Sequence, residues 1–336
     1  MSASTAALGR GRRAAAVCAV LLAGMVLAAI WSLKSGILEI GWGRMARALC
    51  GAGDADVMLV WTKFRLPRIV MAVLVGMGLS VSGALLQGIT RNDLATPGIL
   101  GIIGGGNLAV VLAVLTAGRM LHPVALPAAS FVGAALTLGL VILLSGRGAM
   151  HCPERMLLTG IAVSTALGAA ISVISMFLPM MMFDYVTAWL SCSLARASWR
   201  YDLLLLPWIA VLLPLCWLYA DSLNVMSLGD EVATGLGVRL VRTRFVLVLI
   251  AVGLAAPCVA VGGSVMFLGL LAPHIARRLV GTNYRYVLPV AALAGSFLLL
   301  SADVVGRIIV PLKELPAGLV VTALGGPYFL YLLARR

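Results

Sequence analysis

Residues 14–33 read AAAVCAVLLAGMVLAAIWSL, a run of 20 residues without a charge. About 20 apolar residues span the hydrocarbon core of a bilayer as a helix. The run follows Arg10, Arg12 and Arg13 as a secretory signal peptide would, but the apolar region of such a peptide is usually only about 7–15 residues long. We therefore expect this stretch to be retained as a first membrane span that also serves as the insertion signal.

The rest of the chain has the same apolar character. Of its 336 residues, 62% are apolar and 11% are charged, whereas about 25% of the residues in a soluble domain are charged. In lipid, backbone groups must form hydrogen bonds within their own segment, which favours helices. The apolar runs are also too long and continuous for the alternating strands of a membrane barrel. The composition therefore predicts an all-α polytopic membrane protein.

Charged residues and prolines divide the chain into about ten apolar runs. The run at 264–280 carries Pro273, His274, Arg277 and Arg278 in its second half, so we expect it to form a short helix that leaves the membrane early. We expect spans near residues 14–33, 64–88, 97–117, 123–145, 155–178, 202–220, 242–262, 264–280, 287–309 and 315–334.

The distribution of Lys and Arg predicts how the chain is oriented. With the N-terminus in the cytoplasm, 14 of the 25 Lys and Arg residues fall on the cytoplasmic side, where an excess of cations is usual. Both termini are then cytoplasmic. The net charge of +13 does not indicate nucleic-acid binding, because the cations lie between apolar runs and form no stripe interleaved with aromatic residues.

Sequence motifs for several kinds of chemistry are absent. There is no GxxxxGK[ST] phosphate loop and no HExxH metal motif. The six cysteines form no CxxC pair and several lie inside apolar runs, which favours packing residues over disulfides or a metal site. The run Gly104-Gly105-Gly106-Asn107 has no nucleotide-fingerprint spacing, so we interpret it as helix packing beside a polar pathway.

Asp303 is the only acid that the sequence places inside a span. Arg307 lies four residues further on and therefore on the same helix face. We interpret the two as an ion pair near the outer end of the span rather than as a proton relay, because one acid without further relay groups is thin support for proton coupling.

Residues 81–88 (VSGALLQG) resemble residues 261–269 (VGGSVMFLG), and each segment follows a long span. With the spans counted above, the two segments lie on opposite sides of the membrane. This weak internal similarity favours an inverted repeat of the kind found in transporters.

Three further segments carry a family resemblance. The first is RLPR at 65–68, followed by SGALLQG at 82–88 and NDLATPG at 92–98. The second is LGDEVATGLGV at 228–238. The third comprises FLGLLAPHIAR at 267–277, Ala302-Asp303, ELPAG at 314–318 and GGPYF at 325–329.

Together these segments resemble the FecCD family of permeases, which serve bacterial importers of ferric siderophores, haem and cobalamin. The resemblance extends from Arg65 to the end of the chain. The sequence departs from the family where Asp93 replaces a frequent Pro and where Ser191-Cys192 replaces a frequent Gly-Ser.

The resemblance implies a subunit of ten helices that is not an enzyme. It implies a homodimer or heterodimer of permeases in the inner membrane, with the substrate path along the dimer interface. Two cytoplasmic ATPase subunits would bind ATP and Mg²⁺, so this chain itself would hold no cofactor. A periplasmic or lipid-anchored binding protein would deliver the substrate. The expected domains are a cytoplasmic tail at 1–13 and a single transmembrane permease domain at 14–336, with a coupling loop at 221–241.

Ferric siderophore is the expected substrate on frequency alone, and haem and cobalamin stay open. An ion-coupled secondary transporter is the alternative from another class. It would need several paired acids within the membrane, and the sequence does not offer them.

The resemblance also assigns roles to three sets of residues. Asp230 and Glu231 suit the N-terminus of a short helix, and Gly235 with Gly237 would end it after about two turns. The ATPase coupling set is Gly229, Asp230, Glu231, Ala233, Gly235, Leu236 and Gly237. The set expected to meet carboxylates of the binding protein, as exposed cations, is Arg65, Arg68 and Arg307. The expected path-lining residues are Asn107, Ser164, Thr165, Ser172 and Met176, beside a soft vestibule of Met180, Met181 and Met182.

Overall fold

The computed structural model describes residues 3–36, 40–49, 54–117, 125–146, 153–192, 194–309 and 314–334. Throughout these ranges the regular structure is helical and no strand occurs, which confirms the all-α class. The longer helices are α1 (Ala3–Lys34), α4 (Leu66–Thr90), α5 (Ile102–Ala117), α6 (Ala125–Ser145), α7 (Pro153–Met176), α9 (Trp199–Leu218), α12 (Leu240–Gly262), α14 (Tyr284–Ile309) and α15 (Ala317–Ala334). The shorter ones are α2 (Trp42–Leu49), α3 (Ala55–Val60), a π-helical turn (Trp61–Arg65), α8 (Met180–Leu190), a 3₁₀ turn (Leu194–Arg196), α10 (Ala220–Met226), α11 (Asp230–Gly235) and α13 (Leu268–Val280).

Each expected span coincides with a helix, but the count of about ten membrane crossings is not confirmed. By length and composition, 7 helical segments of the described chain could cross a membrane. The helices α5 and α15 are apolar but shorter than these, and α13 has only 13 residues. The 7 segments are Gly9–Lys34, Ala55–Thr90, Ala125–Ser145, Pro153–Met176, Trp199–Leu218, Leu240–Gly262 and Tyr284–Ile309.

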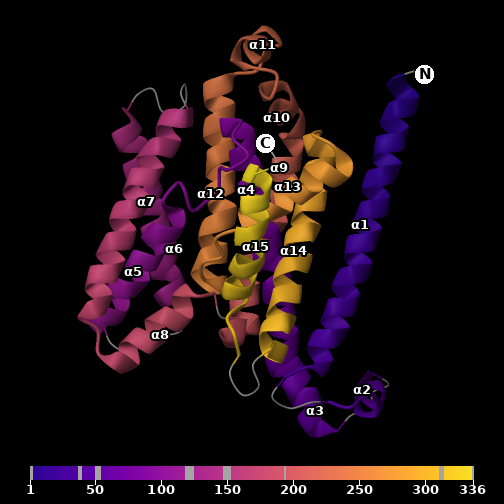
Figure 1. Ribbon diagram of the computed structural model, residues 1–336, viewed down its shortest axis with the longest axis vertical. Coiled ribbons are helices and arrows are strands. Elements are labelled where there is room, and N and C mark those ends of the chain that lie inside the picture. The colour runs from indigo at the N-terminus through magenta and orange to yellow at the C-terminus, as the bar shows by residue number, and fades with distance from the viewer. Residues whose placement is uncertain are drawn as a thin grey trace.

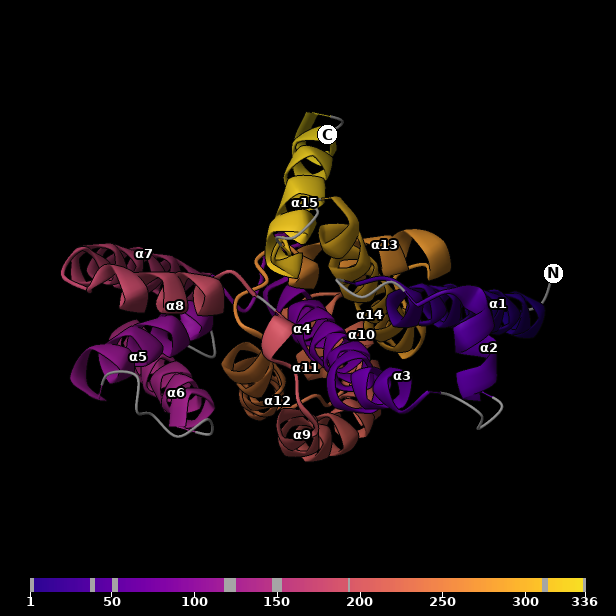
Figure 2. The same ribbon diagram turned by 90° about the horizontal axis from the view of Figure 1, so that it is seen from below.

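The helix α4 lies at the centre of the bundle, in contact with α9, α12, α13 and α14 (Figure 2). Small residues make this close packing possible. A Cβ atom on Gly76 would overlap the backbone of Ser296 in α14, and one on Gly83 would overlap the backbone of Gly269 in α13. In lipid, such close backbone approach contributes van der Waals contact where no hydrophobic effect drives the helices together.

The two segments that resemble each other in sequence touch each other, so the expectation that they lie on opposite sides of the membrane is wrong. Residues 81–88 and 261–269 meet where Gly83 approaches Gly269, and Gln87 Nε2 donates a hydrogen bond to the Gly269 carbonyl at 3.3 Å. The inverted repeat stays a prediction, now with its two most similar segments in contact near the centre of the bundle.

The helices α5 to α8 form a group on one side of the bundle, and α1 packs along α14 on the other side (Figure 1). Within this group, Gly105 lies against Gly133 and Thr137 of α6 so closely that a Cβ atom would overlap both. The glycine run at 104–106 therefore serves helix packing, as predicted.

The bundle has two distinct ends. One carries α11 together with the start of α1 and the end of α15, and we call it the α11 end (Figure 1). The opposite end carries α3 and α8, and we call it the α3 end. The two termini thus lie towards the same end as the expected coupling loop. Helix α1 already begins at Ala3, so it continues through most of the segment expected to be an N-terminal tail.

Candidate functional site

The segment at 228–238 forms a separate short helix at the tip of the α11 end (Figure 1). Asp230 and Glu231 occupy its first turn, as expected. It is bounded by Gly229 and Gly237, whose φ angles are +116° and +86°. Other residues rarely adopt these angles, and nothing lies within 4 Å of where a Cβ atom would be. Backbone conformation, rather than crowding, therefore requires glycine on both sides of α11.

Asp230 anchors α11 to the bundle through two arginines. The Nη2 atom of Arg244, which lies in the first turns of α12, donates hydrogen bonds of 2.7 and 2.9 Å to the two carboxylate oxygens. Arg91, in the left-handed conformation just after α4, pairs with the same carboxylate. Arg244 is buried but Asp230 is 40% exposed, so this is a charge-assisted contact that is shielded from water on the arginine side. Sequence reasoning missed these partners because they lie far from Asp230 in the sequence and only the fold brings them together.

Three exposed apolar side chains, which we call the apolar row, lie on α11 and on either side of it. Leu228, Val232 and Leu236 are 63%, 47% and 64% exposed, while Ala233 is fully buried against the bundle. Val232 lies within α11, Leu236 directly follows its last residue, and Leu228 precedes Gly229, so the fold of this segment rather than helical spacing exposes the three together. An exposed apolar row on a helix that projects from the bundle is typical of a surface that another protein covers. An open groove of about 810 Å³ adjoins it, lined in part by Val238, Val241 and Phe245.

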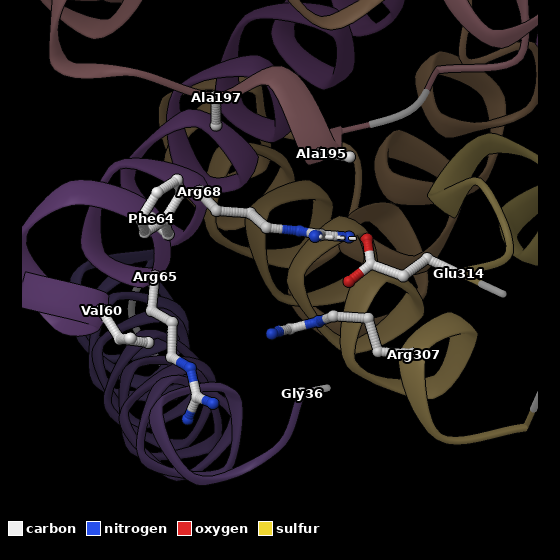
Figure 3. A pocket seen from close by; sticks show the side chains of 9 residues that line it. All are labelled: Gly36, Val60, Phe64, Arg65, Arg68, Ala195, Ala197, Arg307 and Glu314. Carbon is white, nitrogen blue, oxygen red and sulfur yellow. Dashed lines mark hydrogen bonds and ion pairs between the residues drawn. The ribbon is translucent and has the colours of Figure 1, made fainter. Parts of the chain in front are cut away.

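At the α3 end, the three arginines expected to act together do converge on one pocket (Figure 3). Arg65 comes from the π-helical turn, Arg68 from the first turn of α4 and Arg307 from the last turn of α14. The pocket has a volume of about 470 Å³, and Glu314 also lines it.

Two carboxylates neutralise part of this positive charge. Arg68 contacts Asp303 with Nε and Nη2 at 2.9 and 2.7 Å, and its Nη1 contacts Glu314 at 2.6 Å. Arg307 also pairs with Asp303, at 3.0 Å, which confirms the predicted ion pair within α14. Three arginines against two acids leave a formal excess of one positive charge.

The arginines are not the exposed cations that we expected. Arg65 is only 5% exposed, and its guanidinium donates a hydrogen bond to the Leu33 carbonyl oxygen. Arg307 is buried and contacts Ser32 and Ser35 near the end of α1. The apolar stems and charged heads of these side chains are enclosed by α1 and α14, whereas snorkelling side chains would end in solvent. Their docking role stays a prediction.

A second buried acid escaped the sequence analysis. Asp202 lies in the first turn of α9 and is buried, and neither of its carboxylate oxygens has a hydrogen-bond partner among the described residues. The prediction that Asp303 is the only embedded acid was therefore wrong. In the sequence, Asp202 stands just after Trp199 and Arg200 at the start of an apolar run, and this pattern does not indicate that its side chain is buried.

The five residues expected to line the path divide into two groups. Thr165, Ser172 and Met176 share the exposed face of α7. Ser164 lies on another face and donates hydrogen bonds to the carbonyls of Gly98 and Ile99, at 3.0 and 3.3 Å. Asn107 is half-buried in α5, and its side-chain oxygen has no partner. Only the first group is placed where another subunit or a substrate could touch it directly.

The methionines expected to form a vestibule lie at the start of α8, at the α3 end. Met180 and Met181 are exposed, and Met182 is half-buried against α5 and α7 side chains. Exposed Met residues offer an adaptable apolar surface.

Comparison with known proteins adds to this geometry. The FecCD transport family matches residues 13–335. The chain is 41% identical over 310 residues to the iron(3+)-hydroxamate import system permease protein FhuG of Bacillus subtilis (strain 168), with 90% of this chain and 92% of that protein covered. It is 37% identical over 323 residues to the hemin transport system permease protein HmuU of Yersinia pestis, with 94% of each covered. Among solved structures it is similar to an inward-facing metal-chelate type ABC transporter, with a TM-score of 0.85, 28% identity and coverage of 95% and 99%.

Proposed function

The chain belongs to the FecCD transport family, and we propose that it is the permease subunit of an ATP-binding-cassette importer of ferric siderophores in the bacterial inner membrane. Permease subunits of this kind are not enzymes. Two copies of the permease, or this chain and a related one, would enclose the substrate path. Hydrolysis of ATP would take place on two separate cytoplasmic subunits.

The observation that carries this proposal is the exposed apolar row on α11. A projecting helix, anchored by a buried arginine and left uncovered by the residues that the structure describes, fits the contact through which an ATPase moves a permease. Leu228 and Val232 join the coupling set on this basis. The α11 end would then be cytoplasmic, and the α3 end would meet the substrate-binding protein.

Transport by alternating access follows from this arrangement. ATP binding would favour one state of the dimer and ATP release the other, because a ligand shifts an equilibrium only by its difference in affinity for the two states. The exposed face of α7 with Thr165, Ser172 and Met176 would lie at the interface that opens and closes. The relatives transport iron-hydroxamate and hemin, and the higher identity to the former supports a siderophore.

An ion-coupled secondary transporter is the second candidate, because Asp202 is buried without a partner. Asp303, by contrast, is engaged by two arginines, Arg68 and Arg307. Uptake that survives a protonophore while ATP is maintained would favour the ATP-driven importer. Uptake that collapses under the protonophore would favour the alternative.

The proposal is tested by uptake of labelled ferric siderophore, haem and cobalamin under iron limitation in a strain that lacks this chain. The strain is complemented with the wild type, with Leu236→Asp, and with the control Leu203→Ala at an exposed site on α9. We expect the wild type and the control to restore uptake of one substrate, and Leu236→Asp to insert normally without restoring it. If the wild type changes uptake of none of the three, the importer function is wrong.

A further inference from the structure

Arg68 holds two carboxylates in two different ways. Asp303 accepts hydrogen bonds from Nε and Nη2 and is 1% exposed, and it shares its charge with Arg307 in the same helix. Glu314 contacts the remaining atom, Nη1, at 2.6 Å and is 28% exposed (Figure 3). The Asp303 contact is thus part of the buried structure, whereas the Glu314 contact opens to the pocket.

The energetic cost of breaking the two contacts differs accordingly. Removing a partner from a buried ion pair leaves an uncompensated charge and is strongly destabilising. The contact with Glu314 contributes less, because Glu314 is partly exposed and water can take its place on Nη1 of Arg68. Glu314 is therefore the carboxylate that Arg68 can exchange.

We propose that Glu314 occupies the place that a carboxylate of the docking binding protein takes, so that docking exchanges one carboxylate for another on Arg68. The inference rests on the proposed function, since it requires a protein partner at the α3 end. It adds that the contact is already filled from within the chain when no partner is bound, and that docking releases the segment that leads into α15.

The surroundings of Glu314 explain why its release would matter. The next residue, Leu315, donates a backbone hydrogen bond to the Gly306 carbonyl at 3.1 Å, which ties the segment to α14. Two residues beyond that is α15, where Gly318 packs against the backbone of Ser191 and the side chain of Cys192. Among the described residues, Arg68 is the side chain that holds Glu314, so loss of this contact removes a side-chain anchor just ahead of α15, which packs against the α8–α9 connection.

The exchange of carboxylates on Arg68 also fits the net charge of the arginine pocket. A formal excess of one positive charge attracts an acidic partner and fixes its register, which is what complementary charges at an interface do best. Because one carboxylate replaces another, the net gain is small and the partner can leave after delivery.

The experiment measures binding of a ferric-siderophore-binding protein to the complete transporter in lipid nanodiscs. The probe is a binding protein that stimulates ATP hydrolysis by the wild-type complex. For Glu314→Gln, which keeps the shape and removes the competing charge, we expect binding about two- to fivefold tighter than for the wild type. For Arg68→Gln we expect a loss of at least about tenfold.

Asp56→Asn is the matched control. Asp56 is exposed on α3 at the same end and undergoes the same change of charge without contacting the arginine pocket. We expect its affinity to stay within twofold of the wild type. Glu314→Asp serves as a second variant that keeps the charge but shortens the reach to Arg68, and we expect its affinity to lie between those of the wild type and Glu314→Gln.

The outcomes separate the inference from the function on which it rests. Binding that is weaker or unchanged in both Glu314 variants would mean that Glu314 merely holds Arg68 in place, and the exchange would be wrong. Equal tightening in Asp56→Asn would reduce the effect to bulk charge, with the same consequence. If no siderophore-binding protein stimulates the wild-type complex, the proposed function fails and the exchange fails with it.

Discussion

Truncating the apolar row on α11 should detach the ATPase without disturbing the fold of the permease. We consider the double substitution Leu228→Ala and Leu236→Ala. The two side chains are 63% and 64% exposed in the chain by itself, so their loss leaves no cavity in the bundle. Surface substitutions of this kind usually change the free energy of unfolding by less than about 0.5 kcal/mol.

The effect on assembly follows from the area that a partner would cover. Full burial of a Leu side chain contributes about 1.5–3 kcal/mol, so covering the exposed two thirds of both contributes about 2–4 kcal/mol. Alanine retains one carbon of each side chain, which leaves an expected loss of about 2–3 kcal/mol. This corresponds to an increase of about 30- to 150-fold in the Kd of the ATPase subunit.

The assay is a titration of the ATPase subunit onto the permease in nanodiscs, together with the thermal stability of the permease alone. The control carries Leu143→Ala and Leu203→Ala, which remove the same number of carbon atoms from exposed sites on α6 and α9. We expect the control to bind the ATPase like the wild type. A change of less than threefold for the α11 variant, or an equal loss for the control, would refute the assignment of this row to the ATPase.

Three further predictions test other parts of the structure. Arg244→Met removes the buried donor to Asp230 and should raise the rate of amide hydrogen exchange in α11 by about tenfold, measured by mass spectrometry. The reason is that a charge-assisted pair of this kind contributes about 1–2 kcal/mol when one member is partly exposed. An exchange rate that matches the wild type would mean that the pair does not anchor the helix. Gly83→Leu should abolish stable insertion, because the new side chain would overlap the backbone of Gly269. The measurement is the yield of monodisperse protein in detergent, and a yield like that of the wild type would contradict the close packing of α4 on α13. Burial raises the pKa of the Cys192 thiol to about 12, so the protonated thiol should resist maleimide up to pH 9 and react after unfolding in detergent. Rapid labelling at Cys192 itself in the folded protein, located by mass spectrometry of its peptides, would contradict the burial.

Composition and local patterns were sufficient for the class of the fold and for the helix positions. Apolar runs of about 20 residues require helices in lipid, so every expected span coincides with a helix. The short helix α11 was also predictable, because Gly229 and Gly237, whose φ angles are positive, delimit it and such angles depend on residues next to each other in the chain. The pairing of Asp303 with Arg307 followed from a spacing of four on one helix.

Only the tertiary structure decided the burial and the ion pairing of the three arginines. Nothing in RLPR at 65–68 indicates that Arg65 would be enclosed near the end of α1, or that Arg68 would meet an acid 246 residues later. The same holds for Asp230, whose anchor Arg244 lies in the next helix, and for the buried Asp202. Helix formation depends on neighbours within a few residues, and a sequence contains that information directly. Burial and ion pairing depend on which helices pack side by side, and here that is set by glycines such as Gly76 and Gly83, which let distant segments approach closely enough to enclose a charge.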